Sequence, residues 1–254
     1  MMNTIGKRPW LRLAALLIIL GGVVVLKTQS AAAQGNAATA RGEAEADPWE
    51  PFNSRMFWFN HDVLDQYVLK PLAQAWNFVL PDPAQRSLRN VVDNTNVLSR
   101  LVNSLTQGKW SGAGRELARF GINSTVGIGG LLDVAKEGFR IEKSDEDTGQ
   151  TLGFYGIGPG PYLVLPFLPP MDVRDGLGTV VDGSMNPLNY IIPFAGLANA
   201  GTTAGALAGI TATDAVNWRS LNLELYEGIE EAVLDPYSAV RNAYLQKREA
   251  KVKE

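Results

Sequence analysis

His61 is the only histidine among 254 residues, and the chain contains no cysteine. A nucleophilic triad needs a histidine that is oriented by an acid, and no Gly-x-Ser-x-Gly elbow exists to accompany His61. Without cysteine the chain cannot form disulfides, thiolate zinc sites or iron–sulfur clusters. We therefore predict a protein that is not an enzyme and has no catalytic residues, no metal site and no cofactor.

Other motif-like patterns in the chain are incomplete. The glycines of Gly156-x-Gly158-x-Gly160 lack a preceding strand and are followed by Pro161, so they predict turns rather than a dinucleotide-binding loop. Residues 142–148 lack the alternating acids and the glycine of a calcium loop, and they predict a charged surface loop. The neighbours Arg174 and Asp175 predict a structural ion pair.

The composition excludes disorder over most of the chain and argues against nucleic acid as a partner. Apolar residues make up 46% and charged residues 19%, compared with about 25% charged in ordinary domains. Residues 1–33 carry four basic residues and no acidic one, which leaves 19 basic against 26 acidic residues in the rest. A net acidic chain beyond residue 33 does not suit the negative phosphate backbone.

Residues 1–33 have the features of an export signal. Basic residues precede an uncharged apolar run over 13–26, and Ala31-Ala32-Ala33 fits the small-x-small cleavage rule. At 1.5 Å per residue the run spans about 21 Å, short of the roughly 30 Å hydrocarbon core. A cleaved signal peptide is therefore favoured over an uncleaved inner-membrane anchor.

The mature chain is expected to consist of a tether and one domain. Residues 34–46 have no large apolar side chain and predict a flexible tether. Residues 47–254 show helical periodicity and few strand patterns, which predicts a single all-α domain. Export places this domain beyond the cytoplasm.

The first helix of the domain is apolar over half of its circumference. With a rotation of 100° per residue, the apolar side chains between Phe52 and Val68 fall within one half of the helix circumference. Asn53 and Asn60 lie within the same half. The two asparagines either bond backbone groups in a core or line a polar passage beside lipid. Lys70-Pro71 is expected to close this helix, because proline disfavours helix at the residue before it.

Proline and glycine divide the remaining chain into further helices. Asp82-Pro83 predicts a helix start, with apolar periodicity that continues to about Gly108. A helix over about 114–126 follows. Asp235-Pro236 begins the last helix, and residues 247–254 predict a solvated charged tail.

Two apolar segments are unusual for a soluble protein. Residues 161–170 contain four prolines, which exclude a regular helix or a central strand and predict a rigid extended loop. Residues 183–213 carry no charge, but their prolines, asparagines and glycines favour a re-entrant hairpin over a straight membrane span. For both segments the alternative is burial in a soluble core. The hairpin's second arm carries a small-residue ladder expected to pack helices closely: Gly201, Gly205 and Gly209.

Several motifs in order resemble the MlaA (VacJ) family of outer-membrane phospholipid-transport lipoproteins from Gram-negative bacteria. They are Asp47-Pro-Trp-Glu-Pro-Phe-Asn53, Gly149-Gln-Thr-Leu-Gly-Phe-Tyr-Gly156, Gly160-Pro-Tyr-Leu-Val-Leu-Pro166, Asp235-Pro-Tyr237 and the segment 119–135. The resemblance covers about residues 47–247. Family members are lipoproteins, whereas this chain has no cysteine for a lipobox.

The resemblance implies a ring-like helical domain with amphipathic, membrane-lying helices and a re-entrant hairpin around a central pore. Phospholipids misplaced in the outer leaflet would pass through this amphipathic channel to a periplasmic lipid-carrier protein, which keeps the outer membrane asymmetric. A trimeric porin is the family's usual membrane partner. The alternatives are a soluble periplasmic lipid-binding or carrier protein, which the missing cysteine favours, and a hydrolytic enzyme, which lacks a nucleophile–base pair.

Candidate site residues follow from the family match and from the apolar segments. The candidates for the lipid pathway or its gating are Phe52, Asn53, Asn60, Tyr162, Leu163, Leu165, Phe167, Tyr190, Ile192 and Phe194. The candidates for the membrane interface are Trp49, Trp58 and Trp76.

Overall fold

The structure is a computed structural model that describes residues 47–194 and 200–254. The expected signal peptide and tether lie outside these residues. Asp47–Glu254 form one compact unit that is mainly helical. Its elements are α3 (Glu50–Trp58), η1 (Phe59–Leu69), α4 (Lys70–Val79), α5 (Asp82–Thr95), α6 (Val97–Thr106), α7 (Trp110–Thr125), α8 (Val134–Glu137), α9 (Thr148–Phe154), β1 (Tyr162–Leu163), β2 (Met171–Asp172), α10 (Val173–Ser184), α11 (Leu188–Phe194), α12 (Ala200–Leu221), α13 (Leu223–Ala232) and α14 (Pro236–Lys253).

The first helix does not end at Lys70-Pro71, so that expectation is wrong. Lys70 keeps helical angles, φ −62° and ψ −50°, and α4 follows η1 without a break. The segment η1 is a π-helix, and the Lys70 amide still bonds the Asp65 carbonyl, five residues back. Pro71 has no N–H to continue this pattern, and it stands where the chain returns to α-helical spacing. The wider π-turns before Pro71 reduce the clash that normally stops a helix before proline.

The helix expected over 82–108 is two helices with a bend at Asn96. Asp82 lies inside α5 and makes no side-chain cap. The start of α14 agrees with the sequence, since the Asp235 carboxylate accepts a hydrogen bond from the Ser238 amide. The end of α14 does not: residues expected to form a solvated tail continue the helix to Lys253.

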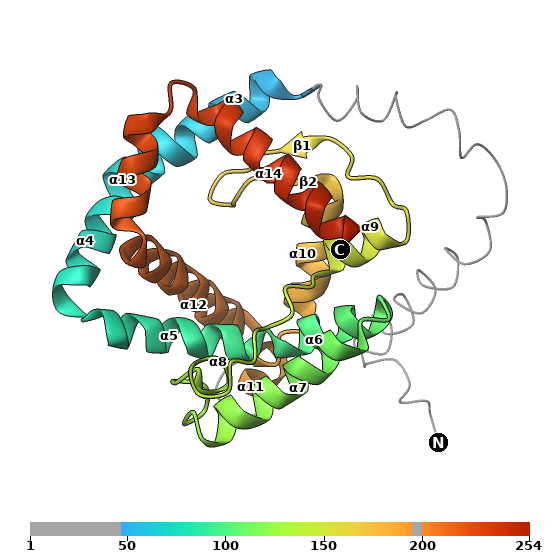
Figure 1. Cartoon of the computed structure of the whole chain (residues 1–254). Helices are drawn as coiled ribbons and strands as arrows, with labels where there is room; N and C mark the ends of the chain where they lie inside the picture. Colours follow the sequence, from blue (N-terminus) through green and yellow to red (C-terminus); the bar gives the residue numbers. More distant parts are fainter. Residues whose placement is uncertain (1–46, 195–199) are drawn as a thin grey trace, which may run out of the picture. The chain divides into compact units, whose positions relative to one another are not determined.

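The helices of Asp47–Glu254 follow one another around the edge of this unit (Figure 1). The helices α3, η1, α4 and α5 make one part of the circuit, and α6, α7, α9, α10 and α14 complete it. The circuit closes where the Tyr237 hydroxyl, at the start of α14, hydrogen-bonds the Asp47 carboxylate. The first residue of the unit therefore lies against the start of its last helix.

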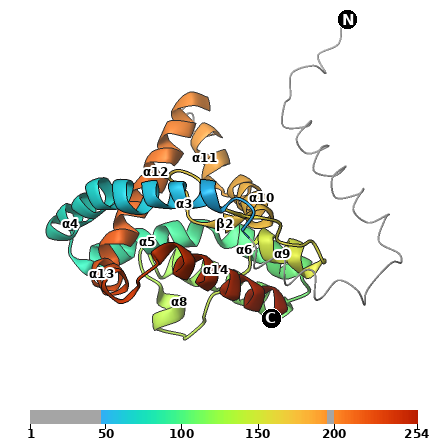
Figure 2. The ribbon, with the colours of Figure 1, turned by 90° about the horizontal axis from the view of Figure 1, so that it is seen from above.

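The uncharged segment forms a helical hairpin made of α11 and the first part of α12, which projects beyond the other helices (Figure 2). Among the described residues, no helix combines the length and apolarity of a membrane span. Farther along, α12 lies against α4 and α5. There Asn217 accepts a hydrogen bond from the Trp76 indole at 3.0 Å and donates one to the Gln85 carbonyl at 2.9 Å.

The expected glycine packing is not met at Gly205 and Gly209 of α12, while the surroundings of Gly201 lie outside the described residues. Among the described residues, no heavy atom lies within 4 Å of a Cβ built on Gly205 or Gly209. Close packing occurs instead between α9 and α10, where a Cβ on Gly178 would overlap the backbone of Gly149. Small residues thus let those two helices cross, because neither has a side chain at the crossing point.

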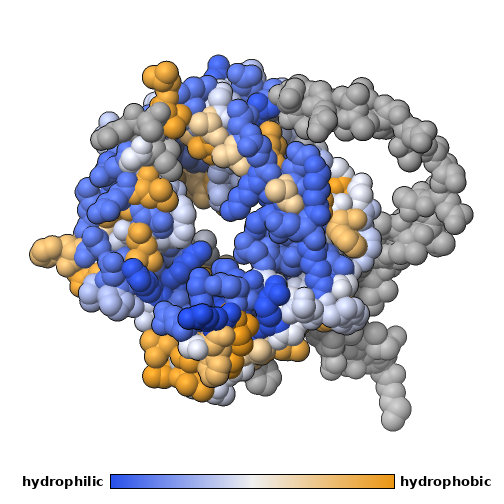
Figure 3. Space-filling model, viewed as in Figure 1, coloured by the Kyte–Doolittle hydropathy of each residue, from blue (hydrophilic) through white to orange (hydrophobic). Residues whose placement is uncertain are grey.

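Polar side chains dominate the buried part of the domain, and large apolar side chains dominate much of its surface. The most enclosed side chains include Arg219, Glu116 and Gln85. By contrast, Phe78 is 92% exposed and Trp110 is 72% exposed. Figure 3 shows a hollow at the centre of this face and apolar residues gathered at its lower and left edges. Exposed apolar surface on this scale indicates contact with an apolar phase or a partner.

Buried ion pairs hold the helices of the circuit together. Arg219 of α12 donates to both carboxylate oxygens of Asp65 in η1, at 2.8 and 3.0 Å. Arg100 of α6 donates to Glu116 of α7 at 2.8 Å. Burial makes each charge costly without its partner, so these pairs fix the register of the helices that carry them.

Candidate functional site

The apolar loop after β1 is bound to the first helix by Asn53. This asparagine is fully buried. Its Nδ2 donates to the Tyr162 carbonyl at 2.9 Å, and its Oδ1 accepts from the Val164 amide at 2.9 Å. Nδ2 also donates to the Asp47 carboxylate at 3.0 Å. The side-chain amide thus pairs with the extended backbone of the loop as a neighbouring strand would.

Asn60 repeats this arrangement one step farther along the loop. Its Nδ2 donates to the Leu165 carbonyl at 2.8 Å, and its Oδ1 accepts from the Phe167 amide at 3.0 Å. The Phe167 ring packs edge-on against Phe59, with ring centroids 5.6 Å apart. We call residues 164–170 the clamped loop. Both asparagines bond backbone groups, which is one of the two roles that the sequence allowed.

The clamped loop is not helical, as the prolines predicted, but it is not extended throughout: it turns at residues 165–168, where the Leu168 amide donates to the Leu165 carbonyl at 3.3 Å and Phe167 has a φ of +66°. It leaves β1 and returns through β2, and these strands pair antiparallel with Tyr162 opposite Asp172 and Leu163 opposite Met171. Val164 is buried, whereas Phe167 is 70% exposed. The loop therefore presents one side to the domain and the other outward. The alternative interpretation, a loop buried in a soluble core, holds only for its inner side.

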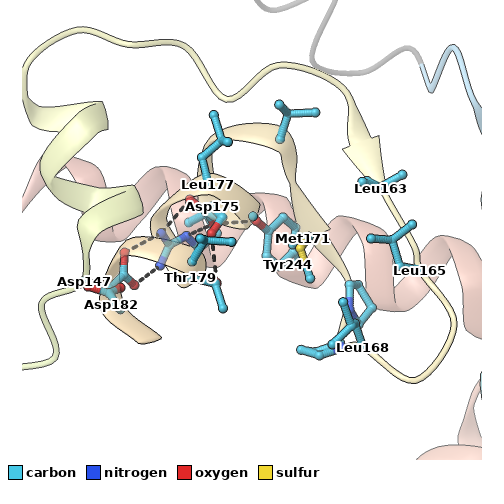
Figure 4. Close-up of a pocket in the computed structure, with 16 residues that line it drawn as sticks. Asp147, Leu163, Leu165, Leu168, Met171, Asp175, Leu177, Thr179, Asp182 and Tyr244 are labelled. Carbon is cyan, nitrogen blue, oxygen red and sulfur yellow. Dashed lines mark hydrogen bonds and ion pairs between the residues drawn. The ribbon is translucent and has the colours of Figure 1, made fainter. Parts of the chain in front are cut away.

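A pocket of about 530 Å³ lies between the clamped loop, α10 and α14. Its apolar wall comes from Leu163, Leu165 and Leu168 of the loop region and from Leu177 and Val180 of α10. Figure 4 shows the leucines of the loop at one end and Asp147, Asp175 and Asp182 at the other. The pocket is amphipathic, since one end is apolar and the other is charged.

Arg248 of α14 connects the acids of the charged end. Its guanidinium donates to both oxygens of Asp147, at 2.6 and 2.9 Å, and to Asp175 at 2.7 Å. The Tyr244 hydroxyl, one turn earlier, donates to Asp175 at 2.5 Å. Arg174 adds a longer contact to Asp175 at 3.4 Å, so the ion pair expected from the sequence is present within a larger network.

Neutral donors surround Asp182. It accepts from the hydroxyls of Ser99 and Thr148 at 2.6 Å each, from the Asn103 amide at 3.0 Å and from the Thr148 backbone amide at 3.1 Å. These bonds join α10 to α6 and α9. They also fix the carboxylate at the wall of the pocket.

Burial and pairing shift the pKa values of this network in opposite directions. Burial opposes ionisation of Asp147, but its hydrogen bonds and charge interaction with Arg248 outweigh this and lower its pKa. Burial and the neighbouring Asp175 carboxylate raise the pKa of Asp172. Burial also raises the pKa of Tyr162 to about 12, with a further contribution from Asp47. Tyr162 and Tyr244 therefore stay protonated at neutral pH.

The structure brings some of the predicted pathway residues together at this pocket. Leu163 and Leu165 line it, while Asn53 and Asn60 hold the loop that forms its wall. Tyr162 is buried next to Tyr244, with ring centroids 5.7 Å apart. Phe52 and Phe167 are exposed on the surface. Their roles in lipid passage stay predictions.

The remaining candidates lie outside the pocket. Tyr190 of α11 is exposed and donates to the Ser184 carbonyl at 2.7 Å, Ile192 is half-buried, and the side chain of Phe194 lies outside the described residues. Trp49 and Trp58 are exposed, as an interface role requires. Trp76 is only half-exposed and is hydrogen-bonded to Asn217.

Sequence reasoning missed the charged end of the pocket. Arg248 was assigned to a solvated tail, and Asp147 to a surface loop. The loop 142–148 is in fact partly buried, with Ser144 and Thr148 enclosed, and Asp147 caps α9 by accepting from the Gln150 amide. One signal in the sequence could have indicated packing here. Arg248 and Val252 are four residues apart, the spacing of one helical turn, so the last helix could continue through this segment with one face against the domain.

The comparisons with known proteins agree with the motifs. A family model described as MlaA lipoprotein matches residues 45–251. The intermembrane phospholipid transport system lipoprotein MlaA of Escherichia coli (strain K12) is 32% identical over 209 residues, covering 82% of this chain and 78% of that protein. The protein of the same name from Haemophilus influenzae is 35% identical over 207 residues, covering 81% and 79%.

A solved structure matches the fold as well. It carries the description "Structural basis for maintenance of bacterial outer membrane lipid asymmetry" and superposes with a TM-score of 0.69 at 31% identity, covering 82% of this chain and 99% of that one. The relatives are named for transport rather than catalysis, which agrees with the prediction that this chain is not an enzyme. The family match extends over nearly all of Asp47–Glu254, and the chain belongs to the MlaA lipoprotein family.

Proposed function

We propose that this protein transports phospholipids between membranes and so maintains the lipid asymmetry of the outer membrane. Phospholipids that have reached the outer leaflet enter the domain, pass through an amphipathic channel at its centre, and leave on the periplasmic side. The transport direction is retrograde. The names of the relatives and the description of the solved structure support this assignment.

The observation that carries the proposal is that polar side chains are enclosed and large apolar side chains are exposed, the reverse of the distribution in a soluble domain. Enclosed positions hold ion pairs such as Asp65–Arg219, while Phe78, Trp110 and other large apolar residues face outward. A helical unit with an apolar outer edge and a hollow face is suited to lie in one leaflet, with lipid around it and a polar lining within (Figure 3). The hairpin of α11 and α12 extends this surface.

The amphipathic pocket behind the clamped loop is a passage or holding site for one lipid. Its volume of about 530 Å³ falls within the range of about 300–1,000 Å³ typical of ligand pockets. The leucines of the loop and of α10 accept an acyl chain, and the charged end meets the headgroup. A soluble periplasmic lipid carrier is the recipient, and a trimeric porin is the membrane partner, as the family resemblance implies.

The test is outer-leaflet phospholipid exposure in intact cells of the bacterium that encodes the chain. An added phospholipase or amine-reactive probe that cannot cross the outer membrane reports this exposure. We expect exposure to rise when the gene is deleted and to return to its original level when the intact gene is restored. Unchanged exposure in a strain without a second homologue would contradict retrograde transport.

Cell fractionation provides the second arm of the test. Recovery of the protein with outer membranes agrees with a channel in the inner surface of that membrane. Recovery without detergent in the periplasmic fraction, together with phospholipid bound to the purified protein, would replace the channel by a soluble lipid carrier.

A further inference from the structure

We propose that the pocket behind the clamped loop selects phospholipids whose headgroup carries an ammonium group, such as phosphatidylethanolamine, over anionic phospholipids. This inference rests on the proposed function, because it assigns a headgroup preference to the same lipid site. It follows from the charges that line the pocket and from how each of them is already paired.

The charged end of the pocket has a net negative charge. Four charged residues line it: Asp147, Asp175, Asp182 and Arg248. Three carboxylates against one guanidinium leave a formal charge of −2. Behind them, Asp172 and Arg174 are both buried and contact each other at 3.4 Å, so together they add no net charge.

Arg248 is already paired with two carboxylates, which leaves it little capacity to bind a lipid phosphate. Both of its terminal nitrogens donate to Asp147 or Asp175, and its Nε is paired with Asp175 as well. A phosphate would have to displace a bidentate carboxylate from a largely buried guanidinium. Charge-assisted pairs of this kind are among the strongest hydrogen bonds in proteins, so Arg248 acts here as a bridge between carboxylates.

Asp182 provides a carboxylate whose hydrogen-bond partners are all neutral. Four bonds from Ser99, Asn103 and Thr148 orient it, but none of them brings a positive charge. Asp182 and the exposed apolar side chain of Val180, both on α10, line the same pocket. A ligand that lies along the apolar wall would therefore bring its headgroup near this carboxylate (Figure 4).

This charge pattern fits a zwitterionic headgroup. An ammonium group gains a favourable interaction with the carboxylates and offsets the repulsion of its own phosphate. Phosphatidylglycerol brings the phosphate without an ammonium, so it meets only repulsion at the same place. Charge complementarity of this kind acts mainly through selectivity, because the wrong partner is penalised.

The experiment measures the headgroups retained by the purified full chain. The protein is mixed with vesicles of equal phosphatidylethanolamine and phosphatidylglycerol, reisolated, and its bound lipids are quantified by mass spectrometry. We expect the bound lipid to be enriched in phosphatidylethanolamine about fivefold, the size of a partly exposed charge interaction. Bound lipid with the same ratio as the vesicles would overturn the inference.

Leu177 offers a variant that changes the pocket's charge without disturbing its network. It lines the pocket and is 61% exposed, so Leu177→Lys adds a cation to the pocket lining and is expected to change stability little. We expect this variant to lose most of the fivefold enrichment. Leu117→Lys places the same charge on an exposed site of α7 and is expected to keep the enrichment as well.

The outcomes separate this inference from the proposed function. If Leu177→Lys retains the enrichment of the unaltered chain, the pocket's charge does not select the headgroup and the inference is wrong. If the protein retains phospholipid without regard to headgroup, only the inference fails. If it retains no phospholipid at all, the proposed function fails first.

Discussion

Asn53 and Asn60 bind successive stretches of the same loop backbone through both atoms of their side-chain amides. Seven residues separate them, nearly two turns of an α-helix, which places them close to one helix face. Each amide satisfies one carbonyl and one N–H of a segment that has little other secondary structure. The position of the clamped loop is therefore set from the first helix, and with it the apolar wall of the pocket.

Replacing Asn53 or Asn60 by leucine should loosen the clamped loop, and the Asn53 variant should lose more stability. Asn53→Leu leaves the buried carbonyl of Tyr162 and the buried amide of Val164 without partners, so we expect a loss of about 2–4 kcal/mol in unfolding free energy. Asn60→Leu acts at a more exposed site and should cost about 1 kcal/mol. Denaturant unfolding measures the first effect, and faster hydrogen exchange at the Phe167 amide reports the second.

Lipid flux in the same variants tests the clamp's functional role. We expect both leucine variants to alter outer-leaflet phospholipid exposure, because the loop they release forms the pocket wall. Asn90→Leu removes a single exposed hydrogen bond to Leu131 and serves as the control. Unchanged flux in Asn53→Leu would remove Asn53 from the residues that govern lipid access.

The ion pair between Asp65 and Arg219 should be essential for the packing of α12. Asp65→Asn leaves a buried guanidinium without its charge partner, and we expect a loss of about 3–5 kcal/mol in unfolding free energy. Asp62→Asn, at a half-exposed carboxylate on the same helix, should change stability by less than about 0.5 kcal/mol. Equal denaturation midpoints for the two variants would show that the buried pair does not hold the helix.

Arg248 should determine how the domain responds to acid. Because the pKa of Asp147 is lowered, the stability from this pair is fully present above the unfolded value near pH 4 and is lost as the pH falls below it. Arg248→Ala removes the hydrogen bond and charge interaction that lower the pKa of Asp147 most and leaves only those from Gln150 to oppose burial, so the carboxylate should take up its proton at higher pH. We expect acid unfolding to begin at higher pH and neutral stability to fall by about 2 kcal/mol. Lys253→Ala, at an exposed pair with Glu249, should change neither, and circular dichroism across pH 2–7 would reveal the difference.

A charge on the apolar wall should block lipid binding without unfolding the domain. Leu168 lines the pocket and is about half exposed, so Leu168→Asp should change stability by less than about 1 kcal/mol. An acyl chain would have to desolvate the new carboxylate, and we expect phospholipid retention to fall about tenfold. Leu117→Asp on α7 provides a matched control, and retention that falls equally in both variants would argue against the pocket.

Local signals in the sequence predicted the start of the last helix and the absence of helix in the loop. Asp235 caps α14 because an aspartate before proline satisfies a free amide at the helix start. The prolines of residues 161–170 excluded helix, which the structure confirms, but they did not predict the turn at residues 165–168 that reverses the loop. Pro71 led to a wrong prediction of a helix end. A π-helix precedes it and Pro71 stands in the first turn of α4, a context that a propensity argument does not include.

The partners of polar residues could not be predicted from the sequence. Asn53 and Tyr162 are 109 positions apart, and Asp147 and Arg248 are 101 positions apart. Periodicity indicates which face of a helix is apolar, but it contains no information on which distant backbone or charge that face meets. The glycines of α12 show the same limit, since spacing alone suggested packing that occurs instead at Gly149 and Gly178.

The central claim is that a phospholipid occupies the pocket behind the clamped loop, and photo-cross-linking in living cells tests it most directly. A photoreactive amino acid placed at Leu165, in the pocket wall, should yield a phospholipid adduct of the protein that mass spectrometry identifies. The same amino acid at exposed Arg115 of α7 should yield little or none. Adducts at Arg115 but not at Leu165, or equal yields at both positions, would contradict lipid passage through this pocket.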